Sequence, residues 1–118
     1  MKADLHNHSY FSDGALSPSE VVRLASDAGC DLFSLTDHDT TNGIVEAKLE
    51  ADNLGLNLVP GVEISAFWRN SPIHIVGLGV DIDNDMLQTG LEFNQNLRKD
   101  RAKKIALSLW RSGIKDAL

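Results

Sequence analysis

The chain has 118 residues, of which 42% are hydrophobic and 24% charged, and its formal net charge is −6. This length predicts one domain with a hydrophobic core, and no apolar stretch approaches the ~20 residues of a membrane helix. The acidity argues against a generic DNA-binding or RNA-binding surface, while a single cysteine, Cys30, and no visible signal peptide favour a cytoplasmic protein.

The first part of the chain predicts a strand, a polar loop and a helix. The strand spans residues 3–6. The helix begins after Ser17, a typical capping residue, with Pro18 at its first position and Glu20 completing a capping box. Gly29 ends this helix. The apolar residues expected on its buried face are Val21, Leu24, Ala25 and Ala28.

Three further strands and two helices follow. We expect strands at residues 31–36, 57–65 and 73–80, and helices at residues 43–54 and 84–111. The residues expected on the buried face of the shorter helix are Ile44, Ala47 and Leu54. Alternating helices and near-continuously apolar strands predict the α/β class, with parallel strands covered by helices. In such folds the active site lies at the carboxyl ends of the strands.

Six side chains of the metal-ligand type lie at or near the ends of these strands, and they include all four histidines of the chain. They are His6, His8, Asp13, His38, Glu63 and His74. Imidazole and carboxylate groups bind Zn, Mn or Fe ions that activate water. The pattern therefore predicts the metal centre of a hydrolase.

The individual motifs differ in strength. His6 and His8 alternate with period two, so both rings can lie on one face of a strand. Glu63 lies within an apolar strand, where a carboxylate is unfavourable unless it is paired or bound to a metal. Taken alone, Asp13 in Ser-Asp-Gly could be a turn residue, and His74 between isoleucines could be a hydrogen-bonded core histidine.

Other charged residues are candidates for supporting roles. Asp37 and Asp39 flank His38, and either carboxylate could orient its ring from outside the metal centre. Arg98 and Arg101 are three residues apart on the last helix and interrupt its core-facing row. Their forked donors suit phosphate, so we expect them to bind substrate, with a solvent-exposed role as the alternative.

The segments DLHNHSYFSDG, TDHDT, GVEIS and HIVGLGVD resemble, in order and spacing, the polymerase and histidinol phosphatase (PHP) family of metal-dependent phosphoesterases. The resemblance is strongest to the bacterial branch that acts on nucleotides and short RNA, which includes 3',5'-nucleoside bisphosphate phosphatases and 5'-to-3' exoribonucleases. It implies a distorted (β/α)7 barrel with two to three divalent ions, Mn, Zn or Fe, at its mouth. The matching helix in similar nucleotide phosphatases carries an Arg-x-x-Arg pair that contacts substrate phosphate.

The resemblance also implies a distribution of ligands among the ions. His6, His8 and Glu63 would hold one ion, and Glu63 would bridge to a second ion that His74 also binds. Asp13 and His38 would serve a third. The implied enzyme is a phosphoric ester hydrolase that cleaves 3',5'-nucleoside bisphosphates or short RNA 5' ends, with a metal-activated hydroxide as the nucleophile.

The later His-Pro and Asp-x-His motifs of the family do not occur before the chain ends at Leu118. Since a (β/α) barrel takes ~250 residues, we expect residues 1–118 to be the N-terminal portion of a PHP domain, with an incomplete site and uncertain activity by itself. Two alternatives remain open: a metal-dependent hydrolase of the amidohydrolase type, and a non-catalytic PHP module of a larger assembly.

Overall fold

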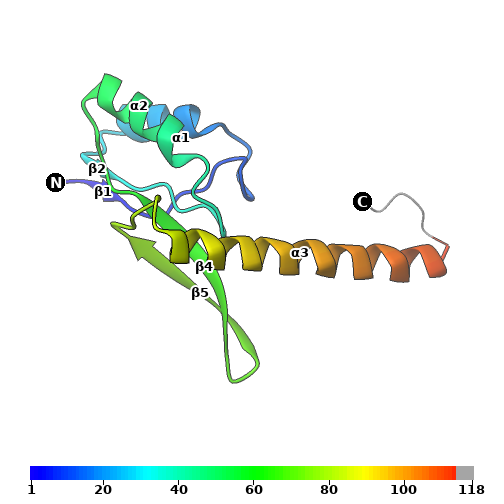
Figure 1. Cartoon of the computed structure of the whole chain (residues 1–118). Helices are drawn as coiled ribbons and strands as arrows, with labels where there is room; N and C mark the ends of the chain where they lie inside the picture. The colour runs from blue at the N-terminus through cyan, green and yellow to red at the C-terminus, as the bar shows by residue number, and fades with distance from the viewer. Residues whose placement is uncertain (114–118) are drawn as a thin grey trace.

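The computed structural model describes residues 1–113, in which a small parallel sheet is followed by a β-hairpin and a long helix (Figure 1). The elements are β1 (Ala3–Asp4), α1 (Pro18–Asp27), β2 (Leu32–Phe33), α2 (Ile44–Leu54), β3 (Asn57–Leu58), β4 (Gly61–Trp68), β5 (Ser71–Leu78) and α3 (Asp85–Arg111). Strands β1, β2 and β3 pair in parallel in this order. Helices α1 and α2 lie together beside this sheet, as expected for the α/β class.

The core lies between α1, α2 and the segment around β2. Its buried residues are Val22, Ala25, Phe33, Leu35, Ile44, Ala47, Ala51 and Leu56. The predicted cap of α1 is confirmed, because the Ser17 side chain accepts a hydrogen bond from Glu20 N. The predicted buried faces are partly wrong: Leu24 is 58% exposed and Leu54 is 43% exposed. In α1, Val22 faces the core instead of Leu24. In α2, Ala51 faces the core instead of Leu54.

The prediction that all strands are parallel is wrong for the last one, because β4 and β5 form an antiparallel hairpin. The connection between them consists of Arg69 and Asn70, whose φ angles are +49° and +65°. Two successive residues with positive φ form the tight turn that suits a hairpin, whereas a parallel crossover needs a dozen or more residues. Positive φ is uncommon for arginine, so composition gave little sign of this turn.

The third predicted strand is divided into β3 and β4. Pro60 lies between the two strands and has no N–H to donate to a ladder. Its carbonyl oxygen accepts hydrogen bonds from Gly79 N at 2.8 Å and Val80 N at 3.1 Å. The chain thus changes partners at Pro60, leaving the parallel sheet and entering the hairpin.

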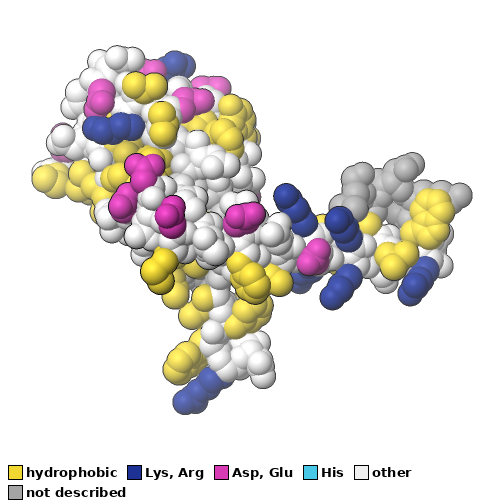
Figure 2. Space-filling model, viewed as in Figure 1, with side chains coloured by type: hydrophobic (Ala, Val, Ile, Leu, Met, Phe, Trp, Pro, Cys, Tyr) yellow, Lys and Arg dark blue, Asp and Glu magenta, His cyan; other side chains and the backbone are white. Residues whose placement is uncertain are grey.

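The hairpin and α3 project from the α/β part (Figures 1 and 2). The radius of gyration is 16.5 Å, against about 13.5 Å for a compact chain of this length. Leu91 is the buried residue of α3, whereas Phe93, Ile105 and Phe67 of the hairpin are 50% or more exposed. In Figure 2, hydrophobic side chains cover much of the hairpin, and Lys and Arg side chains line α3. None of the described helices, α3 included, is apolar enough over sufficient length to cross a membrane.

Candidate metal centre

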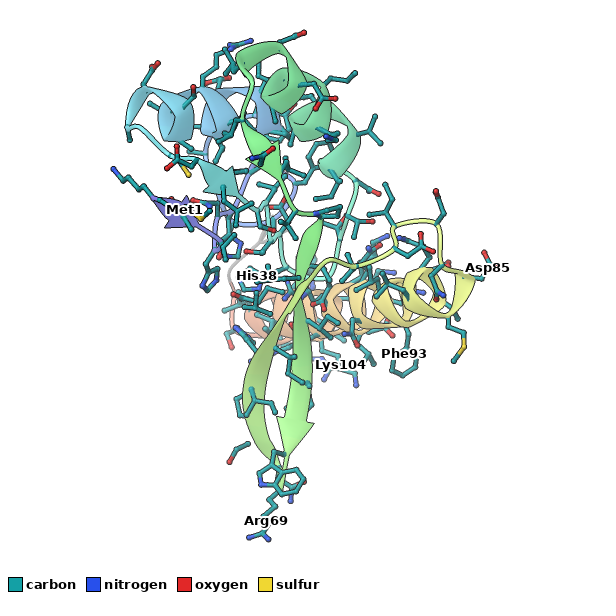
Figure 3. All side chains as sticks on the ribbon, turned by 90° about the vertical axis from the view of Figure 1, so that its left-hand side faces the viewer. Met1, His38, Arg69, Asp85, Phe93 and Lys104 are labelled. Carbon is teal, nitrogen blue, oxygen red and sulfur yellow. The ribbon has the colours of Figure 1, made fainter. Side chains whose placement is uncertain are left out.

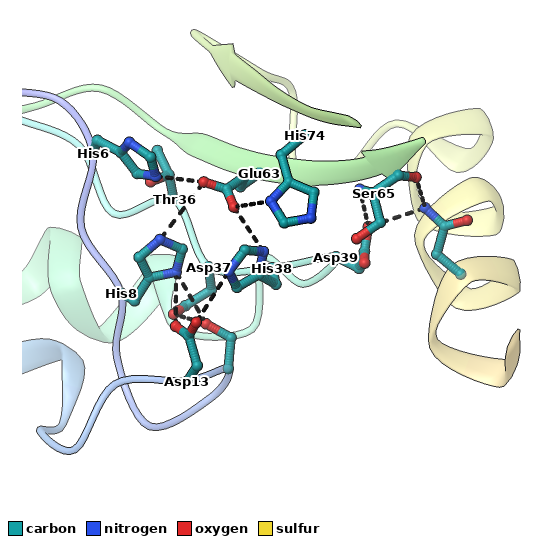
Figure 4. Close-up of polar contacts among 12 residues, drawn as sticks. His6, His8, Asp13, Thr36, Asp37, His38, Asp39, Glu63, Ser65 and His74 are labelled. Carbon is teal, nitrogen blue, oxygen red and sulfur yellow. Dashed lines mark hydrogen bonds and ion pairs between the residues drawn. The ribbon is translucent and has the colours of Figure 1, made fainter. Parts of the chain in front are cut away.

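Glu63 of β4 lies at the centre of a cluster that contains all four histidines (Figure 4). Its side chain is 4% exposed. Its Oε1 contacts His6 Nε2 and lies 3.7 Å from His8 Nε2. Its Oε2 lies 2.8 Å from His38 Nδ1 and 3.1 Å from His74 Nδ1. One buried carboxylate therefore faces imidazole nitrogens from three separate parts of the chain.

Backbone hydrogen bonds fix the position of His38 beside Glu63. The amide of Asp39 donates to Glu63 O at 2.9 Å, and the amide of Glu63 donates to Asp37 O at 3.0 Å. These two bonds form a parallel bridge between His38 and Glu63. The loop after β2 therefore runs alongside the start of β4. The sequence predicted this convergence of loops at the carboxyl ends of the strands.

The hairpin brings His74 to the same centre. His74 pairs with Ser65 across the hairpin, two residues beyond Glu63 on β4. Paired residues share a face of a sheet, and so do residues two apart on one strand. Glu63, Ser65 and His74 therefore lie on one face. His74 reaches the cluster because β5 runs antiparallel to β4 and so brings it back beside Glu63.

Asp13 contacts the two histidines on the other side of the cluster. Its Oδ2 lies 3.1 Å from His38 Nε2, and its Oδ1 lies 3.3 Å from His8 Nδ1. The rings of His8 and His38 stack, with their centroids 4.5 Å apart. Strand β1 ends at Asp4, so His6 and His8 lie in the loop that follows rather than in a longer strand. The Asp13 carboxylate is thus a member of the cluster as well as a turn residue.

Asp37 holds the loop that carries Asp13. Its buried carboxylate accepts hydrogen bonds from Ser9 N at 2.6 Å, Ser9 Oγ at 2.7 Å and Ser12 Oγ at 2.7 Å. The sequence suggested that Asp37 could orient the His38 ring directly. In the structure the His38 ring contacts Asp13 and Glu63. Asp37 affects the ring only indirectly, by holding the loop that carries Asp13.

Asp39 connects the same loop to β4 and α3. Its Oδ1 accepts hydrogen bonds from Ser65 N at 2.9 Å and Asn94 Nδ2 at 3.0 Å, and its Oδ2 lies 2.9 Å from an Arg98 nitrogen. Burial, the largest single effect, raises the pKa of Asp39, but the hydrogen bonds from Ser65 and Asn94 and the Arg98 charge together hold it below its usual value. This fully buried side chain is therefore a carboxylate, which anchors Arg98 near the cluster.

The cluster fits divalent ions in its chemistry and geometry. In three groups the ligand atoms lie within 4.8 Å of one another: His6–His8–Glu63, His8–Asp13–His38 and His38–Glu63–His74. Ligand atoms of one ion lie up to about 4.2 Å apart, twice a bond of ~2.1 Å. Each group therefore needs to contract by about 0.6 Å at most to hold one ion. Within the described residues, the buried His38 Nδ1 has no hydrogen-bond partner although Glu63 Oε2 is 2.8 Å away. Both atoms are of the type that binds a divalent cation.

A cavity of about 520 Å³ opens beside the cluster, lined by Asp13, His38, His74, Arg98 and Lys99 among others. Arg98 thus lies next to the metal-ligand groups, where the sequence predicted a phosphate contact. Lys99 also lines this cavity. Arg101 lines a neighbouring cavity.

Sequence reasoning missed three polar residues of this region. Ser65 Oγ accepts a hydrogen bond from Arg98 at 2.8 Å, and Gln95 Nε2 donates to Asp39 O at 2.7 Å. Asn94 joins Asp39 to the backbone of Ser65. Ser65 is two residues after Glu63 on the same strand, so the alternation of side chains could have placed it on the same face. Asn94 and Gln95 are four and three residues before Arg98, so helical spacing could have placed them on the same side of α3.

The sequence pattern of the PHP domain matches residues 4–109. A 5'-3' exoribonuclease of Haemophilus influenzae is 44% identical over 116 residues, which cover 98% of this chain and 42% of that protein. A 3',5'-nucleoside bisphosphate phosphatase of Chromobacterium violaceum is 43% identical over 111 residues, covering 94% of this chain and 39% of that protein.

The fold is also similar to a solved structure. An amidohydrolase from Chromobacterium violaceum, with bound sulfate and no metal, superposes with a TM-score of 0.90 at 42% sequence identity. The superposition covers 98% of this chain and 40% of that chain. The chain therefore spans about two fifths of the length of the proteins that it matches.

Proposed function

This chain belongs to the PHP domain family, and from that premise we propose that it carries the metal-binding part of a phosphoesterase active site for nucleotides. The observation that carries the proposal is the position of Glu63, a buried carboxylate that faces His6 on one oxygen and His38 and His74 on the other. Such a carboxylate can bridge two cations.

The ligands divide among the ions as the three groups suggest. His6, His8 and Glu63 would hold the first ion, and Glu63 and His74, with His38 nearby, would hold the second. A third would use Asp13 with His38 and His8. We propose Mn, Zn or Fe, which accept mixed imidazole and carboxylate ligands. When bound, these ions would lower the pKa of a water molecule and neutralise charge on the phosphate.

The residues of the chain position the substrate and the ligands. Arg98 and Lys99 line the cavity beside the cluster and supply positive charge for a phosphate. The guanidinium of Arg98 contacts Asp39 and Ser65, so its position is fixed before substrate binds. Phosphoryl transfer depends mainly on such positioning and electrostatics.

Neither Ser12 nor Cys30 is placed as a nucleophile: Ser12 lines the cavity, but its hydroxyl donates to Asp37 Oδ1 at 2.7 Å. Cys30, the single cysteine of the chain, donates its thiol hydrogen bond to Leu32 O at 3.0 Å and packs against the core rather than lining the cavity. Water is therefore the proposed nucleophile. The cytoplasm is the proposed location, which a reduced cysteine of this kind fits.

The proposed substrates are 3',5'-nucleoside bisphosphates or the 5' ends of short RNA. The names of the two relatives support this class, and bound sulfate in the similar structure supports an anion as the ligand. The similar structure is described as an amidohydrolase, so hydrolysis of amide bonds is a second candidate activity. The Arg98 and Lys99 charges beside the cluster favour phosphate, since a neutral amide has no need of them.

A substrate panel tests the proposal. The protein, loaded with Mn²⁺, is assayed for phosphate release from mononucleotides, 3',5'-bisphosphates and short RNAs, and for amine release from amides. We expect metal-dependent cleavage of phosphoesters that a chelator abolishes. Cleavage of amides without cleavage of phosphoesters would refute the proposed class.

A further inference from the structure

Asp39 follows His38 directly and has an unusual backbone conformation. Its φ angle is +52°, in the left-handed region, and its side chain is fully buried. This region is unfavourable for most L-residues, whereas aspartate and asparagine are found there more often because their short side chains form local hydrogen bonds. Such a conformation persists only where the surrounding structure holds it, and it is concentrated at functional sites. The contacts that hold Asp39 therefore indicate its function.

The backbone of Asp39 is hydrogen-bonded on both sides. Its amide donates to Glu63 O at 2.9 Å, and its carbonyl oxygen accepts a hydrogen bond from Gln95 Nε2 at 2.7 Å. The first bond belongs to the bridge that pairs His38 with Glu63, and Figure 3 shows His38 beside the start of the hairpin. The left-handed turn directly after His38 therefore sets the direction of the chain at a ring that contacts Asp13 and Glu63.

The side chain of Asp39 extends away from the ligand cluster, toward Ser65 and α3 (Figure 4). Its Oδ2 lies 2.9 Å from Arg98 Nη2, and within residues 1–113 this contact is an ion pair rather than an aligned hydrogen bond. The same Nη2 donates to Ser65 Oγ at 2.8 Å. Because both contacts use one nitrogen of the guanidinium, the donors on Nη1 and Nε are left for an anion in the adjoining cavity.

We propose that Asp39 is a positioning residue with two separable roles: its left-handed backbone places His38 for a metal ion, and its carboxylate orients Arg98 for a phosphate. This inference rests on the proposed function and goes beyond it, because Asp39 belongs to none of the three ligand groups of the described chain. Its effect passes through its two neighbours. Loss of the carboxylate therefore weakens phosphate binding alone, whereas loss of the left-handed conformation weakens metal binding as well.

Three substitutions at this one position separate the two roles. Asp39→Asn keeps the size of the side chain and a residue type that tolerates left-handed backbone, but it removes the charge that faces Arg98. Asp39→Gly removes the side chain and keeps the conformation, because glycine adopts positive φ readily. Asp39→Ala removes the side chain and also makes the conformation unfavourable. Asp52→Asn is the control for loss of an aspartate charge, since Asp52 pairs with Lys48 on α2 and its side chain is 57% exposed.

Metal affinity and phosphate affinity are measured separately on each protein. Mn²⁺ affinity is obtained by competition with a chelating dye, the Mn²⁺-loaded protein is titrated calorimetrically with inorganic phosphate, and circular dichroism checks that the variants are folded. We expect Asp39→Asn and Asp39→Gly to keep the metal affinity of the unaltered protein and to bind phosphate roughly tenfold more weakly. Asp39→Ala should bind Mn²⁺ about fivefold more weakly than Asp39→Gly. Asp52→Asn should match the unaltered protein in both measurements.

A double variant shows whether the carboxylate acts through the arginine. Arg98→Ala should weaken phosphate binding, and the addition of Asp39→Asn should cost nothing further, because no guanidinium is left to orient. Additive losses, or a loss of metal affinity in Asp39→Asn, would overturn the role of the carboxylate. Equal metal affinities of Asp39→Gly and Asp39→Ala would overturn the role of the backbone. If the metal-loaded, unaltered protein bound no phosphate, the proposed function and the role of the carboxylate would both fail, and the comparison of Asp39→Gly with Asp39→Ala would still decide the role of the backbone.

Discussion

A guanidinium nitrogen of Arg98 lies 2.9 Å from Asp39 Oδ2, which ties α3 to the loop that carries His38. The pair is asymmetric, because the Asp39 side chain is fully buried whereas that of Arg98 is 48% exposed. The exposed part of Arg98 lines the cavity beside the metal-ligand cluster. One residue thus stabilises the loop and presents positive charge to a ligand.

Substitution of Arg98 should affect substrates according to their number of phosphates. In an enzyme that carries the whole PHP domain, Arg98→Ala is expected to cost roughly 1.5–3 kcal/mol in the use of doubly phosphorylated substrates, the value of a charge-assisted contact. Monophosphates should suffer less, because they lack a second phosphate. Steady-state kinetics on both substrate types measure the difference, with Lys103→Ala as a control on an exposed residue of the same helix. Equal losses on both substrate types would return Arg98 to a purely structural role.

The Asp39–Arg98 pair should also contribute to stability. Asp39→Asn, Arg98→Ala and the double variant form a cycle whose coupling free energy urea unfolding can measure. We expect about 0.5–1 kcal/mol, because solvent around the half-exposed Arg98 screens the attraction. Asp39→Asn should destabilise more than Arg98→Ala, because it also disturbs the contacts with Ser65 and Asn94. Zero coupling would show that the two side chains act independently.

Gly14 should tolerate no side chain. A Cβ atom at this position would lie 2.5 Å from the carbonyl oxygen of His8, so the loop that carries His8 and Asp13 would have to move. We expect Gly14→Ala to cost about 1–3 kcal/mol in unfolding free energy and to weaken metal binding. Gly90→Ala is the matched control, because a Cβ there meets nothing within 4 Å on helix α3. That substitution should stabilise the protein by roughly 0.5–1 kcal/mol.

Glu63→Gln should separate metal chemistry from folding. The substitution keeps the size of the side chain but removes the charge that faces His6, His38 and His74. In an enzyme that carries the whole PHP domain, turnover should fall by several orders of magnitude, as for other losses of metal-site charge. Glu50→Gln is the control, since Glu50 pairs with Arg23 away from the cluster. Comparable turnover in the two variants would contradict a bridging role for Glu63.

The sequence predicted the ligand cluster better than it predicted the strands. Loop-end positions and the apolar surroundings of Glu63 indicated which residues come together, because residue types and their spacing are local properties. The period-two argument for His6 and His8 was wrong, because both residues lie in the loop after β1. The hairpin was missed because its turn uses Arg69 and Asn70 at positive φ, without a glycine. The Asp39–Arg98 contact joins residues far apart in the sequence, and local patterns carry no information about such a pair.

The most direct test of this account is the amount of divalent metal that the cluster holds. The protein is loaded with Mn²⁺ or Zn²⁺, desalted and analysed for metal and protein in parallel with a His6→Ala/His8→Ala variant. We expect about one or more ions per chain in the unaltered protein and a clear loss in the variant. Less than about a tenth of an ion per chain in the unaltered protein would contradict a metal centre built on His6, His8 and Glu63.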